Sequence, residues 1–557
     1  MKFLLAAINA KYIHSSLAVR CIHRAVKDDF DVEMCEYTIN DSMSHILAGI
    51  YRAKADVVAF SCYIWNFSMV LTLCDNLKKA SPDTMIVLGG PEVSYSPVEI
   101  LQKHSSPDAV VIGEGEVTVH ELFEALENRK GLSDIRGIAY RHGGGVVQNS
   151  HREPVSYLDD LPFVYDDTID TYKNHIIYYE SSRGCPFSCS YCLSGERGRV
   201  RFLSMERVKK DIDFFVAHKV PLVKFVDRTF NADKARAKEI FKYIIDTAAD
   251  TKFHMELAGD LLDDETIQLL STAPPDIMQF EIGVQTTNTQ TMDAINRKIR
   301  WEPLADNIRK LMANGNIHVH LDLIAGLPHE DLQSFKRSFN DVMALGADVL
   351  QLGFLKILDG SAIKEQTDKY GYRYTTNAPY EIISNNFISY DEILFLHEFE
   401  DVFERYYNNG GFDKSMKVLF DAYDNNYFAL FEDITRCFTK NNLFDISLSK
   451  QRLYDILHDF AESKKIDITE CLKFDYIKAF KSHRVPQWCS EPVDKHFEDC
   501  CYAVLKDEEF KRHKLPHYYD VPAKKAIKTV HFERFSYGVM LFDHESGAVV
   551  DVTEYFE

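Results

Sequence analysis

The sequence lacks the features that mark several large classes of protein. Its 557 residues include only 25 glycines and 17 prolines, and 46% of them are hydrophobic, which excludes collagen-like, low-complexity and disordered chains. No apolar run approaches the ~18 residues of a membrane-spanning helix. The first apolar run reaches charged Lys11 too soon to span a membrane, and it lacks a convincing cleavage site. We therefore expect a folded, soluble, cytoplasmic protein with no membrane partner.

Positive charge is also scarce. The chain has 64 lysines and arginines against 85 aspartates and glutamates, which gives a formal net charge of −21. Proteins that bind nucleic acid draw much of their affinity from contacts between basic residues and phosphates. We therefore do not expect a nucleic-acid partner. At roughly 150 residues per domain, the length predicts three or four domains.

The 12 cysteines do not form a disulfide framework, because a cytoplasmic chain of this length keeps its thiols reduced. Three of them, Cys185, Cys189 and Cys192, form a C-x3-C-x2-C segment after an apolar strand. Zinc usually takes four ligands, often from two CxxC pairs, and the sequence has no matching second pair. An iron–sulfur cluster is normally held by four thiolates. Three thiolates therefore indicate a cluster that leaves one iron open for a substrate or cofactor.

This segment, with Tyr191 just before its last cysteine, resembles that of the radical S-adenosylmethionine (radical SAM) enzymes. The resemblance implies a [4Fe-4S] cluster on Cys185, Cys189 and Cys192, with SAM bound to the open iron. An electron from a donor such as flavodoxin or ferredoxin would then cleave SAM to a 5′-deoxyadenosyl radical. The cofactors carry this chemistry, and the sequence leaves the catalytic residues of the protein unknown.

Residues 176–365 alternate short β-rich runs with amphipathic helical patterns, which predicts a parallel βα array. Six strands suit the partial (β/α)6, TIM-type barrel of the radical SAM family. The carboxyl ends of such strands form the ligand-binding edge. The six predicted strands are 176–182, 222–227, 252–257, 278–284, 319–326 and 349–356.

Polar residues at these strand ends resemble the SAM-binding motifs of one large branch of the family. In that branch the fourth-strand carboxylate and glutamine hold the SAM ribose, and a basic residue on the next helix meets the SAM carboxylate. The second-strand Gly-Gly-Glu of the family is not spelled out here, which leaves Asp227, Thr229 and Asn231 as candidates for the contact with the SAM amino group. The predicted SAM-binding residues are Tyr191, Asp227, Glu281, Gln285, Arg297 and Asp322.

Residues 1–135 hold a second βα series. Five near-continuous apolar strands predict a sheet buried on both faces, which fits a flavodoxin-like (Rossmann-type) doubly wound domain. Glycines at the strand ends let a ligand approach the backbone closely. The missing GxGxxG pattern argues against a dinucleotide cofactor.

The strand-end motifs GGPEVS and VIGEGE resemble the cobalamin-binding domain that precedes many radical SAM barrels. The resemblance implies that the corrin ring lies over the carboxyl ends of the strands. The predicted cobalamin-binding residues are Asn9, Tyr12, His14, Ser15, Ser61, Tyr63, Trp65, Gly89, Gly90, Pro91, Glu92, Gly113, Glu114, Gly115 and Glu116.

The usual Asp-x-His-x-x-Gly motif of cobalamin carriers does not occur in the sequence. Asn9, Ala10 and Lys11 occupy its offset after the first strand. We therefore expect a cobalt without a histidine as its lower ligand. His14, three residues further on, is the alternative ligand.

The remaining segments carry fewer signals. Residues 136–175 resemble the linker between the two domains in this family, and 176–365 form the predicted barrel. Residues 366–557 are predicted to form a mostly helical domain of unknown role, which ends in a strand hairpin. Trp488, Cys489 and the adjacent Cys500 and Cys501 are an alternative auxiliary site, although adjacent thiols rarely bind one centre.

The two cofactors together imply methylation of an unactivated carbon, with the 5′-deoxyadenosyl radical generating a substrate radical and methylcobalamin supplying the methyl group. The substrate class is an unidentified small molecule or peptide. Three alternatives stay open. They are a cobalamin-dependent ring contraction or cyclisation without methyl transfer, a tRNA-modifying radical SAM enzyme, and a cobalamin- or redox-sensing binding protein.

Overall fold

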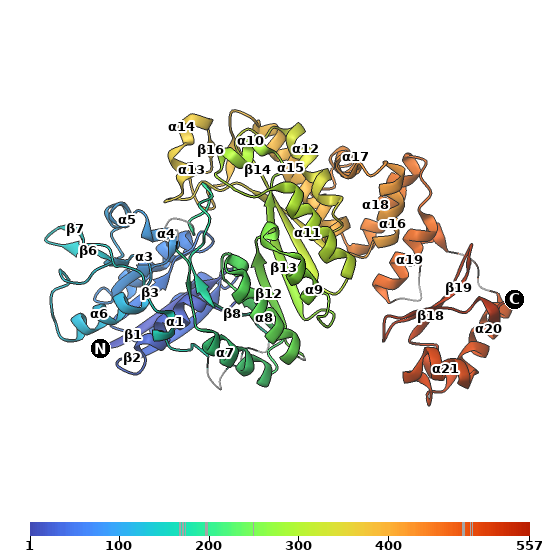
Figure 1. The fold of residues 1–557 in the computed structure, drawn as a ribbon, viewed down its shortest axis with the longest axis horizontal. Coiled ribbons are helices and arrows are strands. Elements are labelled where there is room, and N and C mark those ends of the chain that lie inside the picture. Colours follow the sequence, from blue (N-terminus) through green and yellow to red (C-terminus); the bar gives the residue numbers. More distant parts are fainter. Residues whose placement is uncertain are drawn as a thin grey trace. The chain divides into compact units, whose positions relative to one another are not determined.

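The computed structural model describes residues 1–557 apart from 166–168, 170, 171, 173, 195–198, 249, 482–484, 491 and 493. The chain divides into two compact units, Met1–Ile393 and Leu394–Glu557 (Figure 1). Over this described part of the chain, no helix is both long enough and apolar enough to cross a membrane.

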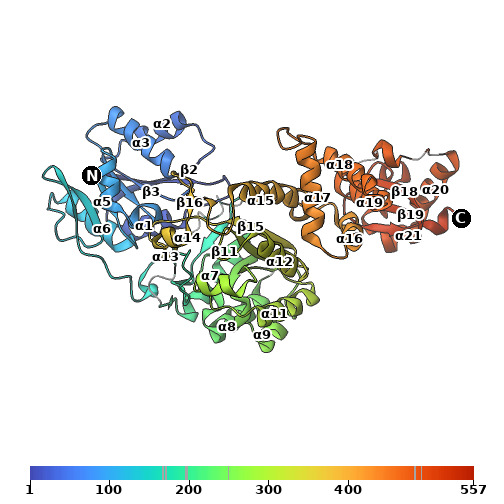
Figure 2. The same cartoon turned by 90° about the horizontal axis from the view of Figure 1, so that it is seen from above.

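The first sheet has the predicted flavodoxin-like topology. Its parallel strands run in the order β2-β1-β3-β4-β5. Helices α2 and α3 lie on the opposite side of the sheet from α1 and α6 (Figure 2). The elements are β1 (Lys2–Asn9), α1 (Leu17–Val26), β2 (Asp31–Thr38), α2 (Met43–Arg52), β3 (Val57–Ser61), α3 (Phe67–Ala80), β4 (Met85–Gly89), α4 (Pro91–Ser94), α5 (Pro97–Lys103), β5 (Ala109–Val111) and α6 (Glu116–Glu127).

Strand β1 shows why the sheet is buried on both faces. Leu4 and Ile8 pack in the core under α2 and α3, whereas Phe3 and Leu5 pack under α1 and α6. Successive side chains of a strand point to opposite faces, so a continuous apolar strand needs helices on both sides. Phe3 stacks on Phe123 of α6 with 3.8 Å between the ring centroids.

The sheet continues past the domain boundary predicted at residue 135. Strands β6 (Ile138–His142) and β7 (Gly145–Gln148) form an antiparallel hairpin that pairs with β5. The glycine run that suggested a linker is the hairpin turn, where Gly143 and Gly144 adopt positive φ. Alternating residues on either side of such a turn favour strands.

The second sheet is the predicted open barrel. Its six strands are all parallel and run in the order β15-β14-β13-β12-β11-β8, so β8 and β15 are its two edges. The strands are β8 (Ile177–Tyr179), β11 (Leu222–Phe225), β12 (Lys252–Leu257), β13 (Met278–Gln285), β14 (His318–Ala325) and β15 (Val349–Phe354). The helices between them are α7 (Met205–Ala217), α8 (Lys234–Thr247), α9 (Asp264–Leu270), α10 (Thr289–Ala294), α11 (Trp301–Asn314) and α12 (Leu332–Met343).

The N-terminal domain contacts both edges of this barrel. At the β8 edge, His14 forms a parallel bridge with Ile176. Beyond the β15 edge, the Tyr380 hydroxyl donates to Glu92 of α4 at 2.6 Å. The carboxyl ends of the strands in the first sheet therefore contact the chain next to both edge strands of the barrel, β8 and β15.

Short elements flank the barrel. Strand β9 (Ser182–Arg183) pairs antiparallel with β10 (Arg201–Phe202), and β16 (Arg373–Tyr374) pairs with β17 (Ile382–Ser384). The first unit ends at Ile393, so the residues between the predicted barrel boundary at 365 and Ile393 belong to the same compact unit as the barrel.

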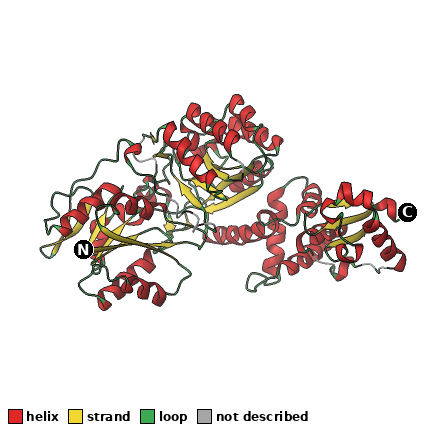
Figure 3. Cartoon of the chain, turned by 90° about the horizontal axis from the view of Figure 1, so that it is seen from below, coloured by secondary structure: helices red, strands yellow, loops and turns green. Residues whose placement is uncertain are grey.

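The second unit is mostly helical, as predicted. The predicted terminal hairpin is present and gains a third strand (Figure 3). From α15, which begins in the first unit, the elements are α15 (Tyr390–Phe403), α16 (Asp413–Ala422), α17 (Tyr427–Lys440), α18 (Lys450–Ser463), α19 (Thr469–Phe480), α20 (Lys495–Lys506), α21 (Glu508–Lys514), α22 (Ala523–Ala526), β18 (Val530–Phe535), β19 (Gly538–Asp543) and β20 (Val549–Asp551).

Candidate functional site

The three predicted cluster ligands lie on the loop that follows β9. Cys185 and Cys189 are buried, Cys192 is half-buried, and all three are free thiols. Gly184 turns the chain into the loop with a φ of +100°, and a Cβ there would lie 2.5 Å from the carbonyl oxygen of Arg199. Only glycine fits such a turn. The turn at Gly184, which follows β9 directly, therefore determines where Cys185 places its thiol.

Barrel residues surround the thiols. The Cys185 sulfur lies 3.4 Å from the Thr229 hydroxyl, and Arg297 Nη1 donates to the Cys189 sulfur at 3.6 Å. Burial raises the pKa of Cys189, and the Arg297 guanidinium opposes that rise. A cationic neighbour stabilises a thiolate, which is the form that binds metal.

Arg297 also joins Tyr191, another predicted SAM-binding residue, to the barrel. Its Nη1 donates to the Tyr191 hydroxyl at 3.0 Å, and its Nη2 donates to the Gly283 carbonyl oxygen. Gln285 has a φ of +72°, at the point where β13 shifts its register against β14. Such bulges re-aim a side chain. Gln285 Oε1 and Arg297 Nε are buried without a hydrogen-bond partner, so each can receive a ligand group.

Both carboxylate oxygens of Asp227 accept hydrogen bonds from the segment that leads to the cysteines. Its Oδ1 accepts from the backbone N–H of Ser181 at 2.7 Å and of Ser182 at 3.1 Å, and its Oδ2 accepts from the Ser181 hydroxyl at 2.5 Å. Burial raises the pKa of Asp227, and these hydrogen bonds oppose the rise. In this structure the side chain holds the cysteine loop, and any contact with the SAM amino group would have to share its oxygens.

Glu281 is ion-paired inside the barrel. Its Oε2 accepts from Lys224 Nζ and from His254 Nε2, each at 3.0 Å. The hydrogen bond from His254 lowers the pKa of Glu281 to about 2, with Lys224 adding to the effect against the opposing influence of burial. Glu281 is therefore an anion that already has two partners.

Two neighbouring carboxyl groups lack such partners. Burial, together with the charges of Glu281 and Glu256, raises the pKa of Asp322 to about 7, and the Asp322 Oδ1 atom is buried without a hydrogen bond. Burial likewise raises the pKa of Glu256, which is paired in register with Glu281 on the adjacent strand. Perturbed carboxyl groups that gather in one enclosed place mark candidate functional sites.

The prediction from sequence missed the basic members of this group, Lys224, His254 and His320. Burial lowers the pKa of His320 to about 4, and its Nε2 lies 2.8 Å from Gln279 Nε2. The available signal was polarity at every second position of β12, β13 and β14, which in a barrel marks the inward face.

The carboxyl edge of the N-terminal sheet carries exposed aromatic and apolar side chains. Tyr12 is 65% exposed, Ile13 45% and Trp65 45%. Trp65 stacks on Tyr63 with 4.4 Å between centroids and an interplanar angle of 6°. Trp65 Nε1 donates to the Ile8 carbonyl oxygen at 3.1 Å, so the indole is fixed although one face is open. A flat, largely apolar ligand fits such a surface.

The other predicted cobalamin-binding residues border this surface. A Cβ on Gly90, whose φ is +108°, would lie 2.5 Å from the Cys62 carbonyl oxygen. Glu92 accepts a hydrogen bond from Tyr380. Ser61 and Gly89 end β3 and β4, Pro91 begins α4, and Gly113 and Gly115 follow β5.

Asn9, His14 and Ser15 hold the turn after β1. Asn9 Nδ2 donates to the His14 carbonyl oxygen at 3.1 Å, and the Ser15 hydroxyl donates to that of Ile176 at 3.0 Å. His14 Nδ1 lies 2.6 Å from the Tyr178 hydroxyl. Burial, then the charge of Lys11, lowers the pKa of His14. This hydrogen bond favours a structural role for His14 over ligation of cobalt.

Glu114 and Glu116 are paired with arginines of the barrel-side loop. Arg183 Nη2 donates to Glu116 at 2.6 Å, and Arg201 donates from both Nη atoms to Glu114. Their carboxylates therefore bind protein, and the neighbouring backbone is what remains for a ligand.

Comparison with known proteins agrees with this geometry. Residues 4–123 match the family described as a B12 binding domain, and residues 179–342 match the radical SAM superfamily. The chain is a cobalamin-binding radical SAM enzyme. Residues 368–551 match a third family, described as a protein of unknown function, DUF4080. The cobalamin, SAM and [4Fe-4S] cofactors implied by the first two domains are those predicted from the sequence.

Two curated relatives of this radical SAM enzyme are methyltransferases. The chain is 26% identical to the 2-(S-pantetheinyl)-carbapenam-3-carboxylate methyltransferase of Streptantibioticus cattleyicolor, over 77% of this chain and 68% of that one. It is 28% identical to the cobalamin-dependent radical SAM methyltransferase TokK of Streptomyces tokunonensis, over 58% of this chain. That match spans half of the length of TokK.

One solved structure supports the fold. The cobalamin-dependent S-adenosylmethionine radical enzyme OxsB, with aqua-cobalamin bound, aligns with a TM-score of 0.60 at 15% identity, covering 84% of this chain and 76% of that one.

The residues present fit the cofactors of this radical SAM enzyme. Three thiols on one loop supply the soft donors that an iron–sulfur cluster takes. The unpartnered Gln285 Oε1 and Asp322 Oδ1 can accept hydrogen bonds from SAM.

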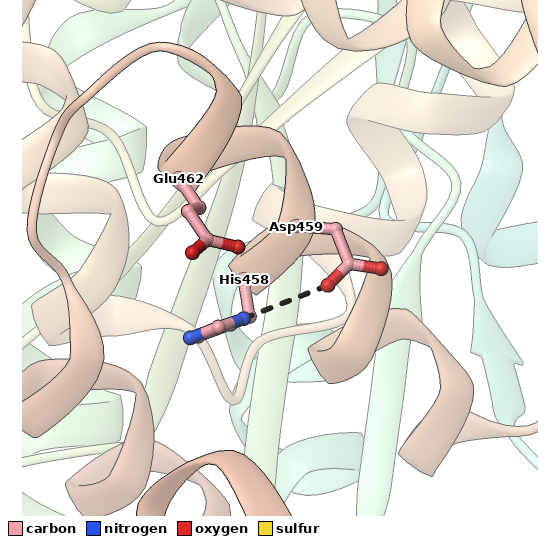
Figure 4. A group of neighbouring side chains, drawn as sticks. All are labelled: His458, Asp459 and Glu462. Atoms are coloured by element: carbon pink, nitrogen blue, oxygen red, sulfur yellow. Dashed lines mark ion pairs between the residues drawn. The ribbon is translucent and has the colours of Figure 1, made fainter.

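The second unit contains a different set of metal-type donors. Ligand atoms of His458, Asp459 and Glu462, all on α18, lie within 4.8 Å of one another (Figure 4). Asp459 and Glu462 are exposed, and the His458 ring stacks on Trp488 at 4.7 Å. Neighbouring polar groups on one helix face account for this arrangement. The alternative site at Cys489, Cys500 and Cys501 is likewise unsupported, because Cys501 packs in the apolar core.

Proposed function

We propose that this enzyme is a cobalamin-dependent radical SAM methyltransferase that methylates an unactivated carbon of a small molecule or peptide. One observation carries the proposal. The carboxyl edge of the N-terminal sheet and the cysteine loop belong to one compact unit, and Arg183, two residues before Cys185, donates to Glu116 at that edge. The methyltransferase names of two relatives support it.

Each side of the site has its own task. Cys185, Cys189 and Cys192 would hold the cluster, while Arg297 would face the SAM carboxylate as a fixed cation. When bound, the cluster supplies the electron that cleaves SAM to a 5′-deoxyadenosyl radical, and cobalamin supplies the methyl group. The protein contributes orientation and the exclusion of water.

The carboxyl groups of the barrel would position SAM and substrate. Asp322 has a pKa of about 7, so it can donate a hydrogen bond when protonated and accept two when ionised. Gln285 adds a neutral acceptor beside it. Lys224 and His254 keep Glu281 ionised and oriented, which leaves Glu256 available to a substrate group.

The cellular setting belongs to the proposal as well. A reducing cytoplasm keeps the thiols free, and a flavodoxin or ferredoxin would deliver the electron. The net charge of −21 gives no basis for nucleic acid as substrate.

The test uses anaerobically reconstituted enzyme and an extract of small metabolites from cells that lack it. We expect a product that gains the mass of a deuterated methyl group when SAM carries that label. A control variant with Cys185, Cys189 and Cys192 replaced by alanine should form neither product nor 5′-deoxyadenosine.

The outcomes separate the alternatives. Formation of 5′-deoxyadenosine with an altered but unlabelled product would contradict methyl transfer and favour a rearrangement or cyclisation. A labelled tRNA, or a tRNA gel shift that persists at moderate salt, would show that the substrate is a nucleic acid. Failure to form 5′-deoxyadenosine under strong reduction would favour a sensor.

A further inference from the structure

Arg183 stands two residues before the first cluster cysteine and binds three carboxylates. Its Nε donates to Glu180 at 2.7 Å, its Nη2 donates to Glu116 at 2.6 Å, and its Nη1 lies 3.4 Å from Glu114. Glu180 belongs to the same loop, but Glu114 and Glu116 come from the N-terminal domain after β5. The guanidinium therefore joins the cysteine loop to the sheet edge predicted to carry cobalamin.

This pairing is shielded from water. The Arg183 side chain is 13% exposed and that of Glu116 is 7% exposed. Burial by itself would lower the pKa of Arg183, but the charges of Glu180 and Glu116 outweigh it and raise that pKa. Removal of one member of a buried ion pair leaves an uncompensated charge. The three carboxylates therefore hold the guanidinium in one place.

A second arginine reinforces the same contact. In the β9–β10 pair, Arg201 lies directly opposite Arg183. Its Nη1 donates to Glu114 at 3.2 Å and to the Val155 carbonyl oxygen at 2.5 Å, while the Val155 N–H donates to Glu114 at 3.0 Å. Burial raises the pKa of Glu114, but the hydrogen bond from Arg201 and the charge of Arg183 outweigh it and lower that pKa.

The barrel holds the other side of the loop. Asp227, beyond the end of β11, accepts from Ser181 and Ser182. Residues 181–183 are therefore fixed by the barrel at one end and by the N-terminal domain at the other, just before Gly184 turns the chain toward Cys185. Side chains from two domains determine where the first thiol stands relative to the first sheet.

We propose that Arg183 is a positioning residue that fixes the cluster loop against the loop of Gly113–Glu116 and so sets the separation of the cluster from cobalamin. The inference goes beyond methyl transfer, because it needs both cofactor sites but no particular substrate. Reactions between two bound groups depend steeply on their spacing.

The test uses the full-length enzyme, reconstituted anaerobically with iron, sulfide and hydroxocobalamin. Arg183→Met keeps the aliphatic length and removes the fork of donors. We expect iron and sulfide contents near those of the wild type. The Kd for hydroxocobalamin, from absorbance titration, should rise by about 10–100-fold. The reduced cluster should also relax the cobalt(II) EPR signal less than in the wild type.

The control is Arg152→Met, which removes an arginine that also pairs with a glutamate of α6 (Glu116–Glu127) but lies away from the cysteine loop. Arg152 pairs with Glu121 of α6 and donates to Thr118 at 2.8 Å. The Arg152→Met variant should have the wild-type Kd for hydroxocobalamin and the wild-type EPR relaxation. Arg183→Lys keeps the charge but not the fork, so its values should lie between those of the wild type and Arg183→Met.

Three results would overturn the proposal. The first is wild-type Kd and EPR relaxation in Arg183→Met. The second is an equal loss in Arg152→Met, which would make the effect one of general stability. The third applies if Arg183→Met cannot be reconstituted with its cluster. The Glu116→Gln variant, which leaves the sequence of the cysteine loop intact, is then measured in its place, and a wild-type EPR relaxation in that variant would contradict the role of Arg183. None of these readouts requires a methylated product, so they are independent of the proposed function.

Discussion

Two carboxyl groups in the barrel show how hydrogen-bond partners decide the pKa of a buried acid. Asp322 and Glu281 come from adjacent strands, yet the pKa of Asp322 rises to about 7 while that of Glu281 falls to about 2. The difference lies in hydrogen-bond partners, because Lys224 and His254 both donate to Glu281, whereas Asp322 Oδ1 is buried without a hydrogen bond. The sequence predicted both carboxyl groups at the barrel edge, but it could not predict which would be paired, since that depends on register between strands.

The first prediction concerns the protonation of Asp322. Its folded pKa lies above the ordinary value, so the fold favours the protonated form, and the stability that comes with it is present at low pH and lost as the pH rises through about 7. Infrared spectra of SAM-free enzyme should show a protonated carboxyl band at pH 6 that fades by pH 8.

The Asp322→Asn variant provides the reference for this measurement. Burial also raises the pKa of Glu330 to about 7, so the wild-type band contains a second contribution. Only the part missing from Asp322→Asn belongs to Asp322. A wild-type spectrum identical to that of the variant at pH 6 would show that the group is already ionised.

The second prediction concerns the turn before the cysteines. Gly184→Ala would force a Cβ to within 2.5 Å of the Arg199 carbonyl oxygen, so we expect reconstituted iron per chain to fall to less than about half. Gly346→Ala is the matched control, because Gly346 also has a positive φ, of +71°, but open space around it. Iron content that is equal in the two variants would contradict the steric argument.

At the scale of strands and helices, the sequence predicted most of the arrangement. The six barrel strands and the doubly wound sheet follow from apolar runs and their alternation with helical patterns. The β6–β7 hairpin was missed because its glycine turn was interpreted as a linker. The pairing of Glu116 with Arg183 was beyond sequence reasoning, because nothing in local composition links residues 67 positions apart.

The third prediction concerns the aromatic edge of the first sheet. Trp65→Ala should raise the Kd for hydroxocobalamin by about tenfold, because a fixed aromatic face that covers a ligand contributes on the order of 1–2 kcal/mol. Tyr537→Ala is the control, since Tyr537 is 53% exposed and belongs to the second unit. Equal titration curves for Trp65→Ala and the wild type would remove the indole from the cobalamin site.

At the scale of the whole molecule, the predicted cofactor residues all fall within the first compact unit. The second unit has its own apolar cores, which include Phe497, Leu541 and Phe542. Its family match carries no function, and the auxiliary site considered at Cys489, Cys500 and Cys501 has no support in the described structure. We therefore expect the cofactor sites to assemble without the second unit.

The fourth prediction tests that separation. A chain ending at Ser389, before α15, should bind iron, sulfide and hydroxocobalamin in the same amounts per chain as the full-length enzyme. It should also form 5′-deoxyadenosine from SAM under dithionite, because the residues proposed to bind SAM remain. Loss of cobalamin binding with correct folding by circular dichroism would show that the second unit contributes to the site.

The contacts of the N-terminal domain with both barrel edges have a further consequence for solubility. An open parallel sheet exposes unpaired backbone groups at its end strands, which are templates for aggregation between molecules. The bridge between His14 and Ile176 pairs the chain just before β8, at one of these end strands. We therefore expect a barrel made without the N-terminal domain to aggregate through the strand edge at β8 that His14 no longer borders.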